Sequence, residues 1–149
     1  MKVGEFCNRD VVVMSGDESV TAAAGLMRSH HVGDVVLVEE RPNGRVPVGI
    51  VTDRDVVVEV VAAGVDPGSL AVRDIVTHSA YVLREEDSLF DALEMMRSRA
   101  VRRVPVVEAD GSLAGIIAVD DVVGLLAELL DELSAVVERQ REREAETRP

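Results

Sequence analysis

The sequence predicts an α/β fold of the α+β kind: two pseudo-symmetric β-α-β-β-α repeats packed sheet to sheet, with an extended C-terminal helix. Three observations predict it: an internal repeat, the same order of apolar patterns in both copies, and an apolar stripe that continues beyond the second copy. We place the first repeat at residues 1–65, the second at 66–130 and a helical extension at 131–149.

The internal repeat appears as a constant offset. Residue 20 falls on residue 89 and residue 39 on residue 108, an offset of 69 throughout, and the two stretches read VTAAAGLMRSHHVGDVVLVE and LFDALEMMRSRAVRRVPVVE. After a loop three residues shorter in the second copy, residues 49–55 fall on residues 115–121. One copy of about 60 residues buries little surface, so we expect the two to pack on each other and to form sites at the seam.

Each copy shows the same succession of elements. In the first we predict a short apolar run at 11–14, a helix at 20–30, strands at 35–38 and 46–51, and a helix at 55–63. Ser19 is the expected N-cap of the first helix, residues 41–44 are a turn signal, Thr52 or Asp53 caps the second helix, and Gly64 ends it. The second copy gives a run at 81–83, a helix at 89–98, strands at 104–108 and 113–119, and a helix from residue 121 onward.

The last helix departs from the symmetry. Leucines and valines continue its apolar stripe at residues 126, 129, 130, 133, 136 and 137. Since monomers rarely expose such a patch, we expect a homodimer in which this helix contributes to the interface. Residues 138–148 carry four Glu and four Arg; this neutral tail is either a solvated helix end or a helix that binds a protein partner.

Composition excludes several function classes. A net charge of −12 and an aromatic content of 2 % argue against nucleic-acid binding, which uses basic patches and stacking platforms. No apolar run approaches the length of a membrane span, and none forms a signal peptide. The lone Cys7 cannot form an internal disulfide; we interpret it as an inert apolar filler in a reducing, cytoplasmic protein.

Thr52 and Asp55 form a Thr-x-x-Asp pair at a predicted strand-to-helix turn. One carboxylate can accept both adjacent hydroxyl donors of a ribose, and a hydroxyl three residues earlier can add a contact. The alternative is that Thr52 is only an N-cap and Asp55 only a first-turn acid that favours the helix dipole. Spacing leaves both interpretations open.

With these motifs in view, the sequence resembles the cystathionine β-synthase (CBS) domain family. The resemblance covers nearly all of residues 1–130, as a tandem pair called a Bateman module. It is carried by the repeated β-α-β-β-α order, by the Val104-Pro105-Val106 strand and, above all, by residues 49–55, GIVTDRD. In this family the Thr-x-x-Asp resembles a ribose grip for adenosine nucleotides, and each cleft takes its Thr/Asp from one domain and its other walls from the other.

The resemblance implies two unequal clefts. The first would combine Thr52, Asp55, Arg54, Thr77, Tyr81, Val101, Arg102 and Arg103. The second, weaker cleft would combine Asp121 and Ala118 with Val12, Val32, Gly33 and Asp34. It lacks the hydroxyl and places Asp34 near a phosphate, so we predict one tight nucleotide per chain. The arginines have an alternative interpretation as solvated charges at a helix end and a strand edge.

No catalytic constellation and no metal site is expected. His30, His31 and His78 lack partners at metal spacing, and the pairs at 53/55 and 120/121 lack further ligands for Mg²⁺. The implied function is a stand-alone regulatory module that requires no cofactor and binds AMP, ADP, ATP or a similar ligand, with or without Mg²⁺. A ligand-free dimerisation module and a small nucleotide hydrolase are the competing hypotheses.

Overall fold

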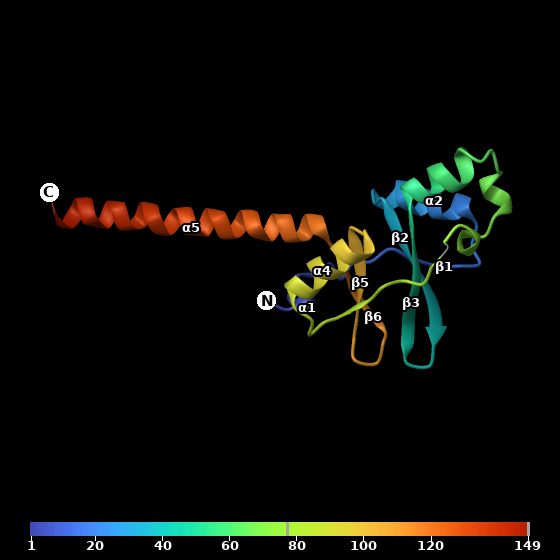
Figure 1. Ribbon diagram of the computed structural model, residues 1–149, viewed down its shortest axis with the longest axis horizontal. Helices are drawn as coiled ribbons and strands as arrows, with labels where there is room; N and C mark the ends of the chain where they lie inside the picture. The colour runs from blue at the N-terminus through green and yellow to red at the C-terminus, as the bar shows by residue number, and fades with distance from the viewer. Residues whose placement is uncertain (77, 149) are drawn as a thin grey trace.

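A computed structural model of the chain describes residues 1–76 and 78–148. Two halves lie side by side, each with a three-stranded sheet, and a long C-terminal helix leaves the second half (Figure 1). The sheets have the orders β1-β2-β3 and β4-β5-β6. They meet along β3 and β6, and their hairpin turns are joined where Asn43 Nδ2 donates to the Asp110 carbonyl at 2.6 Å. The predicted pair of α/β repeats is confirmed.

The first half follows the predicted order closely. Its elements are β1 (Val13–Ser15), α2 (Val20–His30), β2 (Asp34–Arg41), β3 (Gly44–Thr52), α3 (Asp53–Val56) and a π-helical continuation of α3 over Val57–Val61. β1 pairs parallel with β2, and β2 pairs antiparallel with β3. Ser19 caps α2, as predicted. The helix predicted over 55–63 begins earlier, at Asp53, because Thr52 rather than Asp53 is its N-cap.

The second half repeats this arrangement. Its elements are β4 (Leu83–Arg84), α4 (Leu89–Arg99), β5 (Arg103–Val107), β6 (Leu113–Ala118) and α5 (Val119–Thr147). β4 pairs parallel with β5, and β5 antiparallel with β6. The last helix begins at Val119 instead of residue 121, since Ala118 occupies the N-cap position that Thr52 has in the first copy.

Two short segments cross between the halves. Helix α1 (Val3–Phe6) lies against the second half, where the Val3 N–H donates to the Asp87 carbonyl at 2.8 Å. The turn Val72–Asp74 lies against the first half, where the Val72 N–H donates to the Glu18 carbonyl at 2.8 Å. Val3 and Val72 are fully buried and stand 69 residues apart. The repeat offset therefore extends to these segments, and each core is completed by one of them.

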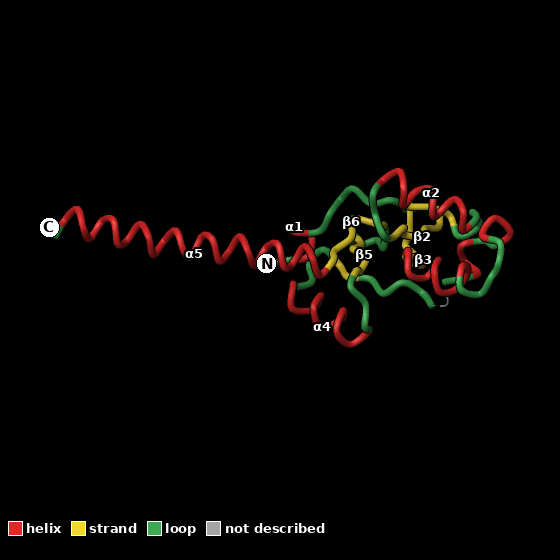
Figure 2. The backbone as a smooth tube through the Cα atoms, turned by 90° about the horizontal axis from the view of Figure 1, so that it is seen from above, coloured by secondary structure: helices red, strands yellow, loops and turns green. Residues whose placement is uncertain are grey.

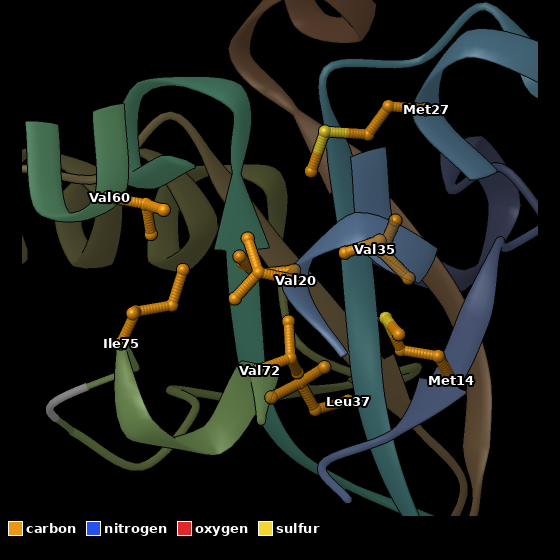
Figure 3. Packing of buried hydrophobic residues seen from close by; sticks show 10 residues of the cluster. Met14, Val20, Met27, Val35, Leu37, Val60, Val72 and Ile75 are labelled. Carbon is orange, nitrogen blue, oxygen red and sulfur yellow. The ribbon is translucent and has the colours of Figure 1, made fainter. Parts of the chain in front are cut away.

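The cores are aliphatic, as the composition predicts. In the first half, side chains from β1, α2, β2 and the Val72–Asp74 turn pack together (Figure 3). In the second, Cys7 follows α1 and packs against β6, where a Cβ on Gly115 would lie 2.7 Å from the Cys7 Sγ. Only glycine allows this approach. Burial raises the pKa of the Cys7 thiol, which favours the unreactive protonated form.

Helix α5 projects from the body over most of its length (Figures 1 and 2). Val122 is its buried residue, while the apolar stripe predicted from Leu126 to Val137 is exposed. None of the helices described is long and apolar enough to span a membrane.

Candidate ligand-binding cleft

The turn from β3 into α3 holds Thr52 and Asp55 in a reciprocal capping box. The Asp55 N–H donates to Thr52 Oγ1 at 3.1 Å, and the Thr52 N–H donates to Asp55 Oδ2 at 2.9 Å. The other carboxylate oxygen, Asp55 Oδ1, takes no part in this capping box. Helix capping therefore uses one oxygen and leaves the other for a ligand, so the two interpretations of this pair are compatible.

The equivalent turn of the second half keeps the carboxylate without the hydroxyl. The Ala118 N–H donates to Asp121 Oδ2 at 2.7 Å, as the Thr52 N–H does to Asp55. Alanine at the N-cap offers no side-chain acceptor to the helix. Asp121 thus has a structural reason to be present whether or not a ligand binds near it.

The Thr52 turn opens into a cleft of about 380 Å³ between the halves, which we call the first cleft. One wall is the end of β3 and the start of α3, and the other is the segment between α4 and β5. Its lining residues are Ile50, Thr52, Asp53, Arg54, Asp55, His78, Ala100, Val101, Arg102 and Arg103. Six residues assigned to this cleft from the sequence are therefore brought together: Thr52, Arg54, Asp55, Val101, Arg102 and Arg103.

One further residue assigned to this cleft, Tyr81, is not among its described lining residues. Tyr81 packs against the second core, and the Arg99 guanidinium lies over its ring at 4.8 Å from the centroid. Thr77 lies outside the described residues.

The sequence reasoning missed four lining residues: Ile50, Asp53, His78 and Ala100. Ala100 has a detectable signal, because the 69-residue offset aligns it with His31. Both residues follow their helix with a left-handed backbone, at φ 53° and 55°. In the second half this turn leads the chain from α4 directly into the cleft wall.

Arg102 reaches the first cleft from a solvent-exposed position. Its Nη2 lies 3.1 Å from Asp120 Oδ1 at the start of α5, and both side chains are 71 % exposed. An ion pair this exposed is weak and is readily exchanged for another anion. Arg102 can therefore turn toward a phosphate at little cost.

Arg103 stands between two clefts. Its Nε lies 3.0 Å from Asp34 Oδ1, and the Asp34 side chain is only 14 % exposed. Burial raises the pKa of Asp34, the Arg103 guanidinium lowers it in part, and the nearby Asp53 raises it again. The Asp34 carboxylate is thus poorly solvated and depends on Arg103 for its counter-charge.

The second cleft is smaller, about 150 Å³, and richer in acid. It is lined by Asp121, Val12 and Val32, which the sequence assigned to it, and Gly33, which was also assigned, is not among its lining residues. Asp34, Ala118 and Arg103 line it as well, together with Asn8, Asp10, Val11 and Ile116. The carboxylates of Asp10, Asp34 and Asp121 outnumber the single guanidinium of Arg103. Their negative charge would repel a phosphate in this cleft.

No group of three or more His, Cys, Asp or Glu side chains that could hold a metal ion is found over residues 1–76 and 78–148.

Comparison with known proteins adds to this geometry. The CBS domain profile matches residues 3–62 and 72–128, and both matches include the capping turns of the clefts. The chain belongs to the CBS domain family. An uncharacterised protein of Methanopyrus kandleri, MK0525, is 35 % identical over 123 residues, which are 83 % of this chain and 61 % of that protein. The chain thus spans about three fifths of that relative.

Two solved CBS structures are similar to this one over most of its length. The CBS domain protein PAE2072 from Pyrobaculum aerophilum, complexed with AMP, has a TM-score of 0.75 and 27 % identity, over 88 % of this chain and 99 % of that chain. A hexameric CBS-CP12 protein from bloom-forming cyanobacteria has a TM-score of 0.74 and 27 % identity, over 99 % of this chain and 88 % of that one.

Proposed function

We propose that this CBS pair is a regulatory module that reversibly binds an adenosine-containing ligand, such as AMP, ADP or ATP, in the first cleft and signals occupancy to a partner or through its oligomer. One observation carries the proposal: the Thr52–Asp55 turn of one half opens into the same cleft as Arg102 and Arg103 of the other. A ligand that combines a diol with an anionic group matches both walls.

Each wall supplies different chemistry to such a ligand. Asp55 Oδ1 is the acceptor that capping leaves for a ribose hydroxyl pair. Arg102 supplies a positive charge for phosphate, and charge-assisted hydrogen bonds of this kind are the strong ones. Ile50 and Val101 give the cleft an apolar surface against which a base can pack. The AMP complex of the Pyrobaculum relative supports this class of ligand.

A thermal-shift panel tests the proposal. Adenosine, AMP, ADP, ATP and S-adenosylmethionine are compared with GMP and GTP, with and without Mg²⁺. A ligand at 100 times its dissociation constant stabilises the folded state by about 2.7 kcal/mol, so binding gives a clear upward shift. If every nucleotide leaves the melting temperature unchanged, the ligand-free dimerisation module is the better description.

The proposal assigns no catalysis to the cleft. Incubation of the protein with ATP and Mg²⁺ is expected to leave the nucleotide intact, because no group of three or more His, Cys, Asp or Glu side chains that could hold a metal ion is found among the described residues. Chromatographic detection of ADP or AMP above the level of a protein-free control would favour the hydrolase instead.

We also propose a cytoplasmic homodimer in which α5 contributes to the interface. The exposed apolar side chains of α5 need a partner surface, and the hexameric CBS-CP12 relative matches this chain over a span that includes α5. Light scattering at tens of micromolar, roughly the range in which a modest interface holds, is expected to give twice the chain mass. A half-buried single cysteine fits a reducing compartment.

A further inference from the structure

The apolar residues of α5 beyond Leu125 belong to neither core. Val122 is buried and Leu125 packs against the second core, whereas Leu130, Leu133 and Val136 are 64, 63 and 66 % exposed. The helix has 29 residues and is therefore about 43 Å long. Figures 1 and 2 show that most of this length runs clear of the body.

Five of the exposed apolar residues have the spacing of a coiled-coil seam. Val123, Leu126, Leu130, Leu133 and Val137 follow one another at intervals of three, four, three and four residues. Alternating intervals of three and four bring side chains to one stripe that packs against another helix. Each of the five is at least 47 % exposed, and we call them the α5 seam.

Charge is divided unequally along α5. Residues 119–137 contain five acidic residues and no Lys or Arg, whereas residues 138–148 contain four Arg and four Glu. A parallel pair of α5 helices would place the two acidic segments side by side, and like charges at that distance repel. An antiparallel pair instead places the start of each acidic segment, with Asp120 and Asp121, beside a neutral segment that contains arginines, and only the acidic residues near the middle of the helix stay close to their counterparts.

We infer that α5 docks antiparallel on α5 of a second copy through the seam. This rests on the homodimer proposed above and specifies its geometry. Leu126 of one copy then faces Val137 of the other, and Leu130 faces Leu133. Residues 138–144, with three arginines and three glutamates, lie beside the partner's residues 119–125, which contain two aspartates and no other charged residue.

Disulfide trapping separates the two orientations. Leu126→Cys and Val137→Cys are made in two separate chains, one carrying a size tag, both in a Cys7→Ser background. In the antiparallel dimer residues 126 and 137 are adjacent, while identical positions lie about 16 Å apart along the axis, beyond the reach of a disulfide. In a parallel dimer only identical positions meet.

After subunit exchange and mild oxidation, we expect the mixed 126–137 disulfide to exceed either same-site disulfide at least tenfold. Predominant same-site disulfides would establish a parallel pair and overturn the inference. Dimers by light scattering without any cross-link would place the interface elsewhere, which overturns the inference and leaves the homodimer standing. Monomers throughout would overturn both.

A pair of single-residue variants tests the seam itself. Leu133→Glu places a charge in the seam, whereas Ala135→Glu places the same charge on the opposite face of the same helix. We expect Leu133→Glu to weaken dimerisation at least a hundredfold and Ala135→Glu to change it less than threefold, with identical circular dichroism. Equal dimerisation constants for the two variants would contradict seam docking.

Discussion

The two clefts of this CBS pair grow from the same turn in two copies, yet they present opposite chemistry. The first is about 380 Å³, with Thr52 and Asp55 on one wall and arginines on the other. The second is about 150 Å³, and its turn has Ala118 in place of the threonine. The carboxylate bond to the N-cap N–H is present in both turns. Both turns thus keep the carboxylate that accepts from the N-cap N–H, whereas the Thr52 hydroxyl, which accepts from the Asp55 N–H in the first turn, is absent from the second.

Arg103 shows that the difference is not a simple division of charges. The sequence suggests Asp34 as a bare repulsive carboxylate in the second cleft and Arg103 as a cation of the first. In the structure the two side chains form one ion pair, and Arg103 lines both clefts. A single guanidinium therefore lies at both clefts, and an anion placed in the first cleft would compete with Asp34 for it.

The largest expected effect comes from the aspartates of the two turns. Asp55→Ala removes a charge-assisted acceptor worth about 1.5–3 kcal/mol, so affinity for AMP or ATP should fall about ten- to a hundredfold. The matched change Asp121→Ala should leave affinity within about twofold. Calorimetric titration of the wild-type protein should show one high-affinity nucleotide site per chain. Two equal sites per chain, or equal losses in both variants, would remove the distinction between the clefts.

Asp34→Asn should release Arg103 to the first cleft. We expect ATP to bind about five- to tenfold more tightly, a gain within the range of a hydrogen bond to a charged group. The same change in an Arg103→Ala background should have no effect on affinity, because the competition no longer exists. A double-mutant cycle by calorimetry measures this, and equal tightening in both backgrounds would show that Asp34 acts without Arg103.

Arg102→Ala is expected to have a smaller effect that depends on the ligand. Because this side chain is 71 % exposed, its loss should weaken ATP binding about three- to fivefold, within the modest range of exposed ion pairs. Adenosine binding should stay unchanged, since the nucleoside carries no phosphate. Parallel titrations with the two ligands check the result, and equal weakening of both would assign Arg102 to the nucleoside or to folding.

The smallest effect concerns pH and stability. Burial raises the pKa of Asp34, so the folded state binds more protons than the unfolded state just above pH 4, the region of an ordinary Asp. The contribution of Asp34 to the free energy of unfolding is therefore largest at low pH and is lost as pH rises through the pKa of Asp34 in the folded state. Asp34→Asn removes this dependence. In urea unfolding, the variant's stability relative to wild type should be more favourable at pH 7 than at pH 4; the opposite order would contradict the burial argument.

Much of the fold could be predicted because the sequence pattern of each element occurs in both copies of the repeat. Helix 20–30 matches α2, and the six cleft residues were found because the capping turn and the segment after α4 each have a local signature. The family resemblance supplied the pairing of these two walls.

Other features leave no local pattern in the sequence. The Arg103–Asp34 pair joins residues 69 apart that occupy equivalent positions in the two copies, and only the packing of the halves brings them into contact. Tyr81 is only three residues from His78, which lines the first cleft. Its ring nevertheless packs under the Arg99 guanidinium and against the second core. The contacts of Arg103 and Tyr81 depend on how the elements pack in three dimensions, and the spacing of residues in the sequence does not determine that packing.

The exchange of segments between the halves has a consequence for folding. Val3 completes the second core and Val72 the first, so a cut between the repeats would deprive each fragment of a fully buried valine supplied by the other. Burying a side chain of this size contributes roughly 1.5–3 kcal/mol, a large share of the stability of a small domain. The halves are therefore interlocked, and heat or denaturant should unfold them in one cooperative transition. A nucleotide bound at one seam then stabilises the whole body.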